Sequence, residues 1–520
     1  MSKFLKAILF ASLLLILAAC ASEPGSENAS GETSGENAGE TLIIATQADA
    51  TMLDPHLGTD IPSANIFHNK IFETLVKQDE NMEFQPGLAT EWERVDETTW
   101  EFTLREGVEF HDGEPFNAEA VKANLERVVN EDLASPRASL FNMISEIEVV
   151  DDYKIRLITE YPYSPMLSNL AHYAGGMISP AAIEEHASGG TTVTENPVGT
   201  GPFVFESWTP GSELNLTTND SYWGEAPSIA GVQYLIIPEA QTRISMVETG
   251  DAHIAEPVTT SSVSRIEGSD VMEFYNTEGL GVDYMGMNVQ KEPFDDKLVR
   301  QAVNHAIDMD ALIEHVYNGV GIPAEGPIGP AVFGHDPELE GYEHNPEKAK
   351  ELLAEAGFPD GFETTISTND DQARRDAAEF IQSQLSEVGI EATIEVMEWG
   401  AYLEATAAGD HEMFILGWSN MTGDGDYNQY YLYHSDSLGP AGNRAFYSNP
   451  EVDALIDEAR SETDQEARAQ LYSEVQQIEV EDAPLALMRH VEHIAAVHES
   501  VEGFWMHPSG ILMLDGVTIE

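Results

Sequence analysis

Cysteines and basic residues are scarce in this sequence. Cys20 is the one cysteine among 520 residues, which excludes an internal disulfide and any zinc or iron–sulfur site built on several thiolates. Only 24 lysines and arginines accompany 92 aspartates and glutamates, which gives a formal net charge of -68. The electrostatic field of such a chain repels phosphate backbones, so nucleic acids are excluded as partners.

Aromatic residues are also few, at 8% of the chain, but 42% of all residues are hydrophobic. This content excludes a disordered or fibrous protein, and the length predicts about three domains. The acid excess is spread along the whole chain, and its self-repulsion destabilises a compact state in dilute buffer. Because the Debye length falls to about 3 Å at ~1 M salt, we interpret the composition as halophilic; an ordinary acidic extracellular protein is the alternative.

The amino terminus predicts export. Lys3 and Lys6 precede an apolar run over residues 7–17, which has the order of a signal peptide and, at 11 residues, is too short to span ~30 Å of hydrocarbon. The run ends in Leu-Ala-Ala-Cys at residues 17–20, which resembles the lipobox of bacterial lipoproteins. We therefore expect a signal peptide over residues 1–19 and lipidation of Cys20; a plain secretory signal is the alternative.

The segment after Cys20 predicts a tether. Residues 21–40 contain no large apolar side chain and cannot bury enough surface to fold. We expect residues 20–40 to form a lipid-anchored, flexible, acidic tether with a reach of roughly 25 Å. The protein is then extracytoplasmic, on the outer face of the cell membrane or in the periplasm of a host with an outer membrane. No later stretch is long and apolar enough to cross a membrane.

The remaining chain predicts a mixed α/β fold. Short apolar or alternating segments indicate strands at 42–45, 99–104, 143–150, 153–159 and 232–237. A helix is expected from residue 239 to a left-handed cap at Gly250. Further helices are expected at 345–357, at 451–460 and at 465–479, the last with an apolar stripe at Ala467, Leu471, Val475 and Ile478.

Strands and helices alternate strictly after residue 360. The expected strands are 363–367, 391–397 and 411–417, with helices between them. Strand–helix–strand units with short links imply parallel strands joined by right-handed crossovers. Ligands bind beyond the carboxyl ends of such strands, which nominates the loops 368–371, 398–399 and 418–427.

Catalytic motifs are missing. The sequence has no GxxxxGK[ST], GxSxG or HExxH, so phosphoryl transfer, α/β-hydrolase and metalloprotease chemistry lack their central features. Asp424, Asp426 and Asn428 are spaced like the start of a calcium loop, but Gln429 and Ser435 replace its glycine and its closing glutamate. Two carboxylates this close are also the minimum for an acid–base hydrolase, but no nucleophile or oxyanion donor accompanies them. A binding role for one of them is simpler.

Histidines do not form a convincing metal set. The spacing of His490, His493 and His498 fits neither a helix face nor a strand face well, so we interpret them as core or surface residues. His111-Asp112-Gly113 is interpreted as a hairpin turn. No metal and no cofactor is predicted.

Several blocks of the sequence resemble one known family. They are TWEFTLREGVEFHDGEPFNAEAVKANLERV (99–128), NPVGTGPFVFESW (196–208), YMGMNVQKEPFDDKLVRQAVNHAID (284–308), NPEKAKELLAEAGFPDGF (345–362) and FYSNPEVDALIDEA (446–459). These blocks are similar to the extracellular solute-binding proteins of family 5, the peptide, dipeptide and nickel receptors of ABC importers. The resemblance covers nearly everything after residue 41.

The resemblance implies a two-lobed, hinged, periplasmic-binding-protein-like fold. Lobe I is expected from residues 41–70, 196–280 and 490–520, an inserted α+β subdomain from 71–195, and lobe II from 281–489. It further implies a monomeric, non-enzymatic lipoprotein that closes on its ligand by hinge bending and delivers it to the permease subunits of an ABC transporter, whose ATPases lie on the cytoplasmic side. To favour closure, the ligand must contact both lobes.

The resemblance also implies ligand-binding positions. In peptide-binding relatives an aspartate shortly after a tryptophan pairs with the α-amino group of the ligand, and this role is carried to Asp424, with Asp426 as a rival. Dipeptide-specific relatives place an arginine before the helix that here starts near residue 371, where this chain has Thr368 and Asn369 instead. A strict dipeptide receptor is therefore not expected. The other candidates are Arg374, Arg375 or Arg444 as substitutes for that arginine, and Trp399, Tyr402, Trp418 and Tyr427 as the lining of side-chain pockets.

These observations favour an oligopeptide receptor. The open alternatives are a receptor of the same fold for a glutathione-like peptide, a metal chelate or an oligosaccharide, and an extracellular hydrolase that uses Asp424 and Asp426.

Overall fold

The computed structural model describes residues 39–520. The expected signal peptide, Cys20 and nearly all of the expected tether lie outside the described residues. Within the described part of the chain, no helix is both long enough and apolar enough to cross a membrane. By its internal contacts, residues 39–520 form one compact unit, so the predicted division into two lobes and a subdomain remains a prediction.

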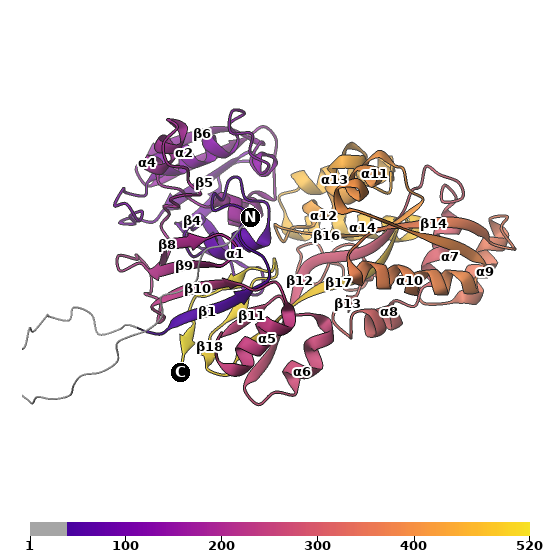
Figure 1. The fold of residues 1–520 in the computed structure, drawn as a ribbon. Helices are drawn as coiled ribbons and strands as arrows, with labels where there is room; N and C mark the ends of the chain where they lie inside the picture. The colour runs from indigo at the N-terminus through magenta and orange to yellow at the C-terminus, as the bar shows by residue number, and fades with distance from the viewer. Residues whose placement is uncertain (1–38) are drawn as a thin grey trace, which may run out of the picture. The chain divides into compact units, whose positions relative to one another are not determined.

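One mixed sheet of eleven strands organises the structure (Figure 1). Parallel pairs join β1 to β10 and β11, and β14 to β15 and β16. In spatial order the strands are β15 (Ile390–Met397), β14 (Phe362–Asn369), β16 (Met413–Ser419), β12 (Met272–Met287), β17 (Leu485–His498), β11 (Ile254–Glu256), β1 (Thr41–Thr46), β10 (Gly231–Ile236), β9 (Glu213–Thr218) and β8 (Phe203–Thr209), with β13 (Ile322–Pro323) paired to β17. We call β8, β9, β10, β1 and β11 the first half of the sheet, and β16, β14 and β15 the second half.

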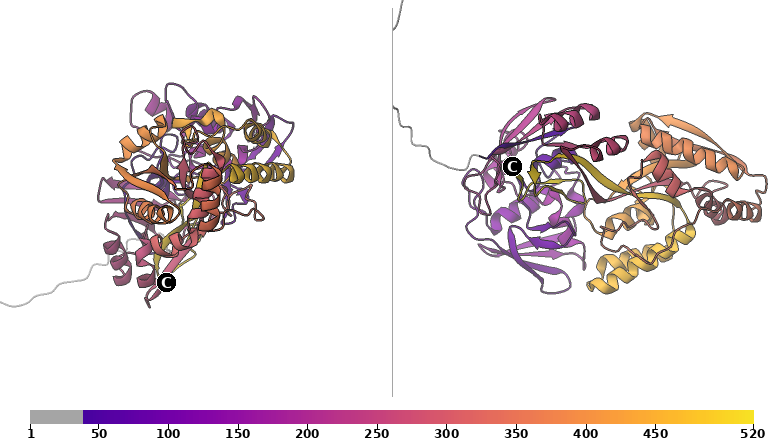
Figure 2. Two further views of the ribbon diagram at one scale, coloured as in Figure 1. Left: turned by 90° about the vertical axis from the view of Figure 1, so that its right-hand side faces the viewer. Right: turned by 90° about the horizontal axis from the view of Figure 1, so that it is seen from below.

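Two long strands, β12 and β17, connect the halves. They are 16 and 14 residues long and pair antiparallel over most of their length, with a register shift between Glu278 and Val282. Figures 1 and 2 show both strands running from the first half of the sheet into the second. The predicted lobe boundaries at 280/281 and 489/490 fall inside these strands.

A separate four-stranded antiparallel sheet lies within residues 71–195. Its order is β4 (Ala89–Arg94), β5 (Thr99–Leu104), β7 (Lys154–Thr159), β6 (Ile144–Asp151). The predicted strand 99–104 is confirmed residue for residue, and the two strands around the Asp151-Asp152 turn pair as expected. Short pairs elsewhere are β2 (Val76–Gln78) with β3 (Phe84–Pro86), β18 (Val501–Glu502) with β21 (Thr518–Ile519), and β19 (Trp505–Met506) with β20 (Leu512–Met513).

Helices cover both faces of the second half of the sheet (Figure 1). Helices α7 to α10 pack against alternate residues such as Met285 and Ile415, whereas α11 to α14 pack against the opposite face at Tyr284 and Phe414. The helices are α1 (Ile61–Phe67), α2 (Ala118–Val128), α3 (Met166–Ala171), α4 (Pro180–Ala187), α5 (Ala240–Thr249), α6 (Val263–Glu267), α7 (Lys297–Ala306), α8 (Met309–Val316), α9 (Pro346–Glu355), α10 (Gln372–Glu387), α11 (Trp399–Ala408), α12 (Gly425–Leu432), α13 (Pro450–Ser461) and α14 (Gln465–Asp482). The predicted left-handed cap of α5 is present at Gly250, with φ of 77°.

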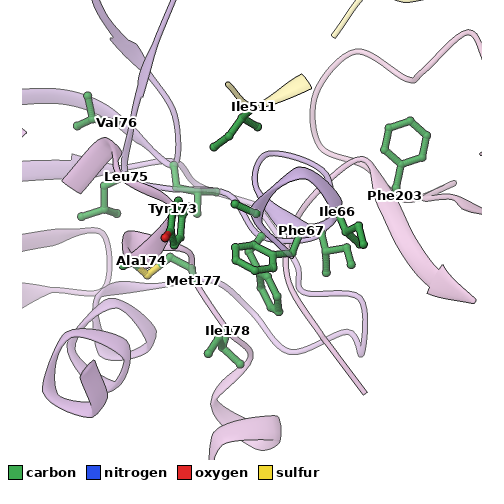
Figure 3. Close-up of a cluster of buried hydrophobic side chains, with 14 of the residues drawn as sticks. Ile66, Phe67, Leu75, Val76, Tyr173, Ala174, Met177, Ile178, Phe203 and Ile511 are labelled. Atoms are coloured by element: carbon green, nitrogen blue, oxygen red, sulfur yellow. The ribbon is translucent and has the colours of Figure 1, made fainter. Parts of the chain in front are cut away.

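The largest hydrophobic core joins the first half of the sheet to the inserted segment 71–195. Phe67 of α1 packs edge-on against Tyr173, with ring centroids 5.8 Å apart, and Ile66, Met177 and Ile178 surround them (Figure 3). Because one core spans these segments, the insertion is fixed to the first half of the sheet.

Candidate functional site

A cavity of about 400 Å³ lies where β14 ends and α10 and α11 begin. The parallel strands of the second half end here, as the sequence predicted for the loops 368–371 and 398–399. The lining residues are Asp283, Tyr317, Asn369, Asp371, Ala373, Arg374, Trp399 and Arg489. Asp283 and Arg489 belong to β12 and β17, just beyond the register shift, so the cavity adjoins the connection between the two halves of the sheet.

Arg374 is a cation of this cavity without a carboxylate partner. No acidic side chain of residues 39–520 lies within ion-pair distance of it. Its guanidinium carbon lies 5.2 Å from the ring centre of Trp399, and its Nη1 donates a hydrogen bond of 3.1 Å to Asn369 Oδ1. Stacking and one hydrogen bond therefore orient the guanidinium, and its other N–H groups are left to bind an anion.

Arg489, on the opposite wall, has partners within the protein. Its Nε donates to Asp283 Oδ2 at 2.9 Å, its Nη1 donates to the carbonyl of Val320 at 2.6 Å, and its guanidinium stacks on Tyr317. Gly417 makes room for the Asp283 carboxylate, because a Cβ there would lie 2.6 Å from Oδ1. The pair gives this wall a fixed polar surface and little net charge.

An aromatic cluster lies at the end of β16. Trp418 packs on Tyr427 and Tyr431 of the α12 region, with ring centroids 5.4 and 5.9 Å apart. Burial raises the pKa of Tyr427 and Tyr431, with Arg137 of the inserted segment close to Tyr427 and opposing the rise. The buried Trp418 Nε1 has no hydrogen-bond acceptor among the described residues. The cluster thus meets the inserted segment and presents one unused donor.

The structure changes the interpretation of Asp424. Its Oδ1 caps α12 by accepting from the backbone N–H of Asp426, and its carboxylate receives two hydrogen bonds from Arg468, at 2.6 and 2.7 Å. Asp424 is 3% exposed and Arg468 1%. The expected acceptor of a ligand ammonium group is therefore already paired by a cation of the protein itself.

Asp426 is also paired. Its Oδ1 lies 2.8 Å from Arg460 Nε, and Arg460 stacks on Tyr430. Burial raises the pKa of Asp426, and the neighbouring Arg460 opposes that rise. Two carboxylates that each have an arginine do not form an acid–base pair, and both belong to the start of a helix instead of a calcium loop.

Three other predicted site residues lie inside the second half of the molecule. Thr368 is fully buried, and the Tyr402 hydroxyl donates to the carbonyl of Ile415. Arg444 donates to the carbonyl of Leu403 at 2.7 Å and to the Thr406 hydroxyl. Tyr402 and Arg444 therefore have internal partners, whereas the buried Thr368 hydroxyl has no hydrogen-bond partner among the described residues. Of the predicted residues, Asn369 and Trp399 line the cavity, and Trp418 and Tyr427 lie in the aromatic cluster; ligand contact by these four stays a prediction.

Sequence reasoning missed the contributions of β12, β17 and α8. Asp283, Arg489 and Tyr317 lie far apart in the chain and follow no strand-end rule. Arg374 was only one of three substitutes for a missing arginine, and because Arg375 shares the first turn of α10, only the structure separates them: Arg374 lines the cavity and Arg375 is exposed outside it. Within residues 39–520 no group of three or more histidine, aspartate or glutamate side chains is arranged to hold a metal ion.

Comparison with known proteins decides the family. The profile of the bacterial extracellular solute-binding proteins, family 5 Middle, matches residues 83–439. The chain belongs to this family. The glutathione-binding protein GsiB of Pectobacterium atrosepticum is 33% identical over 482 residues, covering 91% of this chain and 93% of that protein.

Solved structures of this family share the fold. HbpA2 of Haemophilus parasuis superposes with a TM-score of 0.85 at 28% identity, covering 92% of this chain and 100% of that one. The periplasmic binding protein DppA of Helicobacter pylori, in complex with the peptide STSA, gives 0.79 at 32% identity, covering 93% and 99%. The mixed α/β fold is thus that of periplasmic binding proteins. The protein is the substrate-binding component of an ABC importer, not an enzyme.

Proposed function

We propose that this family member captures short peptides through their free carboxylate and delivers them to the permease. The observation that carries the proposal is Arg374, a cation that lines a cavity and has no carboxylate partner within residues 39–520, although the chain has 92 acidic residues. The peptide complex of DppA and the glutathione-binding relatives support this ligand class. Glutathione, itself a tripeptide, is the first ligand to test.

The chemistry of the cavity explains the selectivity that we propose. A guanidinium group binds a carboxylate through two parallel N–H···O bonds, and these charge-assisted bonds are about twice as strong as neutral ones. Asp371 lines the same space, and its carboxylate repels a ligand that carries a carboxylate alone. A zwitterionic ligand such as a peptide satisfies both signs of charge, with its ammonium group toward Asp371.

The aromatic cluster supplies the second set of contacts in this proposal. Trp418, Tyr427 and Tyr431 lie at the end of β16 next to the inserted segment, and the unused Trp418 Nε1 can donate to a peptide carbonyl. Arg374 and this cluster both belong to the predicted lobe II, so a ligand favours closure only when it also contacts the inserted segment, which meets the cluster near Arg137.

The location is part of the proposal. We place the protein at the outer face of the membrane, anchored through a lipid on Cys20 and working as a monomer in a salt-rich medium. The Leu-Ala-Ala-Cys run at residues 17–20 supports the anchor. Cys20→Ser is expected to move the protein from the membrane fraction to the medium, and an unchanged distribution contradicts the anchor.

Calorimetric titration tests the carboxylate site. We expect Arg374→Gln to weaken binding of Ser-Thr-Ser-Ala or glutathione at least about tenfold, because charge-assisted hydrogen bonds are lost. Arg375→Gln is the matched control, since Arg375 is adjacent, exposed and outside the cavity lining. Equal affinities in the two variants contradict the proposal.

A peptide amide completes the test. The wild-type protein is expected to bind the carboxyl-terminal amide of the same peptide at least about tenfold more weakly than the acid, whereas Arg374→Gln does not distinguish the two. If the wild-type protein binds the acid and the amide equally well, the peptide carboxylate does not bind at Arg374. Mass spectrometry of small molecules released from protein purified without refolding identifies the natural ligand.

A further inference from the structure

A second, larger cavity lies away from the candidate peptide site. Its volume is about 510 Å³, and it shares no lining residue with the cavity around Arg374. It is bounded by the α7–α8 junction, the segments 323–325 and 340–344, the end of α14 and the start of β17. Nothing in the proposed peptide binding uses this space.

Glu479 is a buried acid on the wall of this cavity. It is 2% exposed, and neither carboxylate oxygen has a hydrogen-bond partner among the described residues. The Gln429 amide lies beside it, but the contact does not reach hydrogen-bond geometry. Burial raises the pKa of Glu479 well above its usual range, and the charge of Asp482 adds to the rise, which the neighbouring Gln429 opposes. Burying a carboxyl group without hydrogen-bond partners costs free energy. A ligand that donates hydrogen bonds to Glu479 therefore binds favourably here.

Acidic side chains dominate the charge around the cavity. His305 and His344 also line it, and His344 Nδ1 lies 3.3 Å from Asp308 Oδ2. Asp308, Asp310, Glu325, Glu340 and Glu343 line it together with Glu479, and no lysine or arginine is among the lining residues. Glu479 lies in the last turn of α14, where the helix carbonyls add negative potential. The local field therefore attracts cations and repels peptide carboxylates.

The shape and lining favour an organic cation over a metal ion. Leu485, Leu487, Pro323 and Met309 give one side of the cavity an apolar surface. The acids around it do not converge on one point, since no metal-binding group of three is found within residues 39–520. We propose that this cavity binds an aliphatic amine cation, with its ammonium group hydrogen-bonded to Glu479 and its hydrocarbon stem against Leu485 and Leu487.

Titration with spermidine and with 1,4-diaminobutane tests the proposal. In a fixed salt concentration that keeps all variants folded, we expect saturable one-site binding by the wild type. Glu479→Gln is expected to weaken it at least about tenfold, because a charge-assisted bond to a buried group is lost. Glu474→Gln, an exposed acid on the same helix, is the matched control and retains wild-type affinity.

Three results of these titrations would overturn the amine proposal. Equal amine affinity in Glu479→Gln and wild type overturns the proposal, as does absence of amine binding to the wild type. Competition between spermidine and Ser-Thr-Ser-Ala overturns it too, since it places the amine in the peptide cavity. If Glu479→Gln does not fold, Glu340→Gln at the exposed rim is expected to weaken spermidine binding about two- to threefold. An unchanged spermidine affinity in Glu340→Gln then overturns the proposal.

Discussion

The Asp424 carboxylate has two partners within the protein, the backbone N–H of Asp426 and the guanidinium of Arg468. Its cap to α12 is local, but Arg468 lies 44 residues away, on α14. Arg468 also donates to the carbonyl of Ala459 and to the hydroxyl of Tyr472, so its guanidinium is enclosed on several sides. Because breaking a buried pair leaves the other charge unpaired, Asp424 matters first for folding.

We therefore expect Asp424→Asn to lower the free energy of unfolding by about 3 kcal/mol, since buried Arg468 loses its counter-charge. Urea denaturation at constant salt measures this change. Asp410→Asn, an exposed aspartate with no side-chain hydrogen bond within residues 39–520, is the control and should stay within about 0.5 kcal/mol of wild type. A stable Asp424→Asn protein with weakened peptide binding would restore the role first expected for Asp424.

Buried histidines predict a loss of stability in acid. Burial lowers the pKa of His56, His411, His490 and His507 to about 4, from an ordinary value of 6.5. Between pH 6.5 and 4 the unfolded chain binds more protons at these positions than the folded protein, so the free energy of unfolding falls as the pH falls.

The histidine contribution is isolated by substitution. Denaturation at several pH values is expected to show a shallower dependence between pH 6.5 and 4 for His490→Gln than for wild type, whatever the effect on stability at pH 7. Parallel pH profiles for the two proteins would show that His490 does not titrate with a lowered pKa. Of the three histidines that raised the question of a metal site, His490 is buried, whereas His493 and His498 are partly exposed.

At the scale of single elements, the βαβ region was predictable and α14 was only partly so. Between residues 360 and 419 the helices and strands alternate with clear apolar periods, and parallel pairing of β14 with β15 and β16 is confirmed. On α14 the predicted apolar stripe is displaced, because the buried residues are Arg468, Tyr472, Val475, Gln476 and Glu479. A buried face that contains two charged residues and an amide cannot be found by hydrophobic periodicity.

The long strands β12 and β17 were missed for a similar reason. Each passes from one hydrophobic environment to another and contains polar residues at the transition, including Asp283, Arg489 and His490. Local alternation breaks there, and pairing partners more than 200 residues apart leave no local pattern. Three of the eight residues that line the cavity around Arg374 come from these strands and the end of α8, so only the part built by the strand-end loops and the start of α10 was predictable.

The loop before α3 is a candidate latch between the inserted segment and the second half. The backbone N–H of Ser164 donates to the carbonyl of Arg460 at 3.0 Å, and its hydroxyl donates to the carbonyl of Glu462. The contact joins the inserted segment to the predicted lobe II, so opening of the two lobes breaks it. We expect Ser164→Ala to weaken peptide binding about two- to tenfold, mainly through faster dissociation, because one hydrogen bond of the closed form is lost.

Dissociation rates from stopped-flow fluorescence provide the measurement for the latch. Ser461→Ala is the control, because its hydroxyl bonds only to carbonyls of its own helix, α13. If both variants release peptide at the wild-type rate, the Ser164 contact does not contribute to closure.

For the whole molecule, the charge of -68 is the dominant property. Arg127, Arg468 and Arg489 each form an ion pair with a single acidic side chain. Because the chain has 92 acidic residues and 24 lysines and arginines, most carboxylates have no cation to pair with. The melting temperature of the protein without ligand is expected to rise as salt increases from millimolar to molar concentrations, because screening reduces the self-repulsion. A flat melting temperature over this range contradicts the halophilic interpretation.

The fold as a whole was predictable to the level of its family, since several separate sequence blocks resemble the family and its profile matches residues 83–439. The ligand class was not predictable from the sequence, because ligand specificity depends on which charged side chains are paired within the protein. Asp424 and Arg374 show the difference: the acid is paired and the cation is not.

A crystal structure of the protein saturated with glutathione shows whether Arg374 receives the carboxylate of a bound peptide. We expect a ligand carboxylate within hydrogen-bond distance of the Arg374 guanidinium, in the space bounded by Trp399 and Asn369. A ligand bound elsewhere, or one that pairs with Asp424 after displacing Arg468, would contradict this expectation.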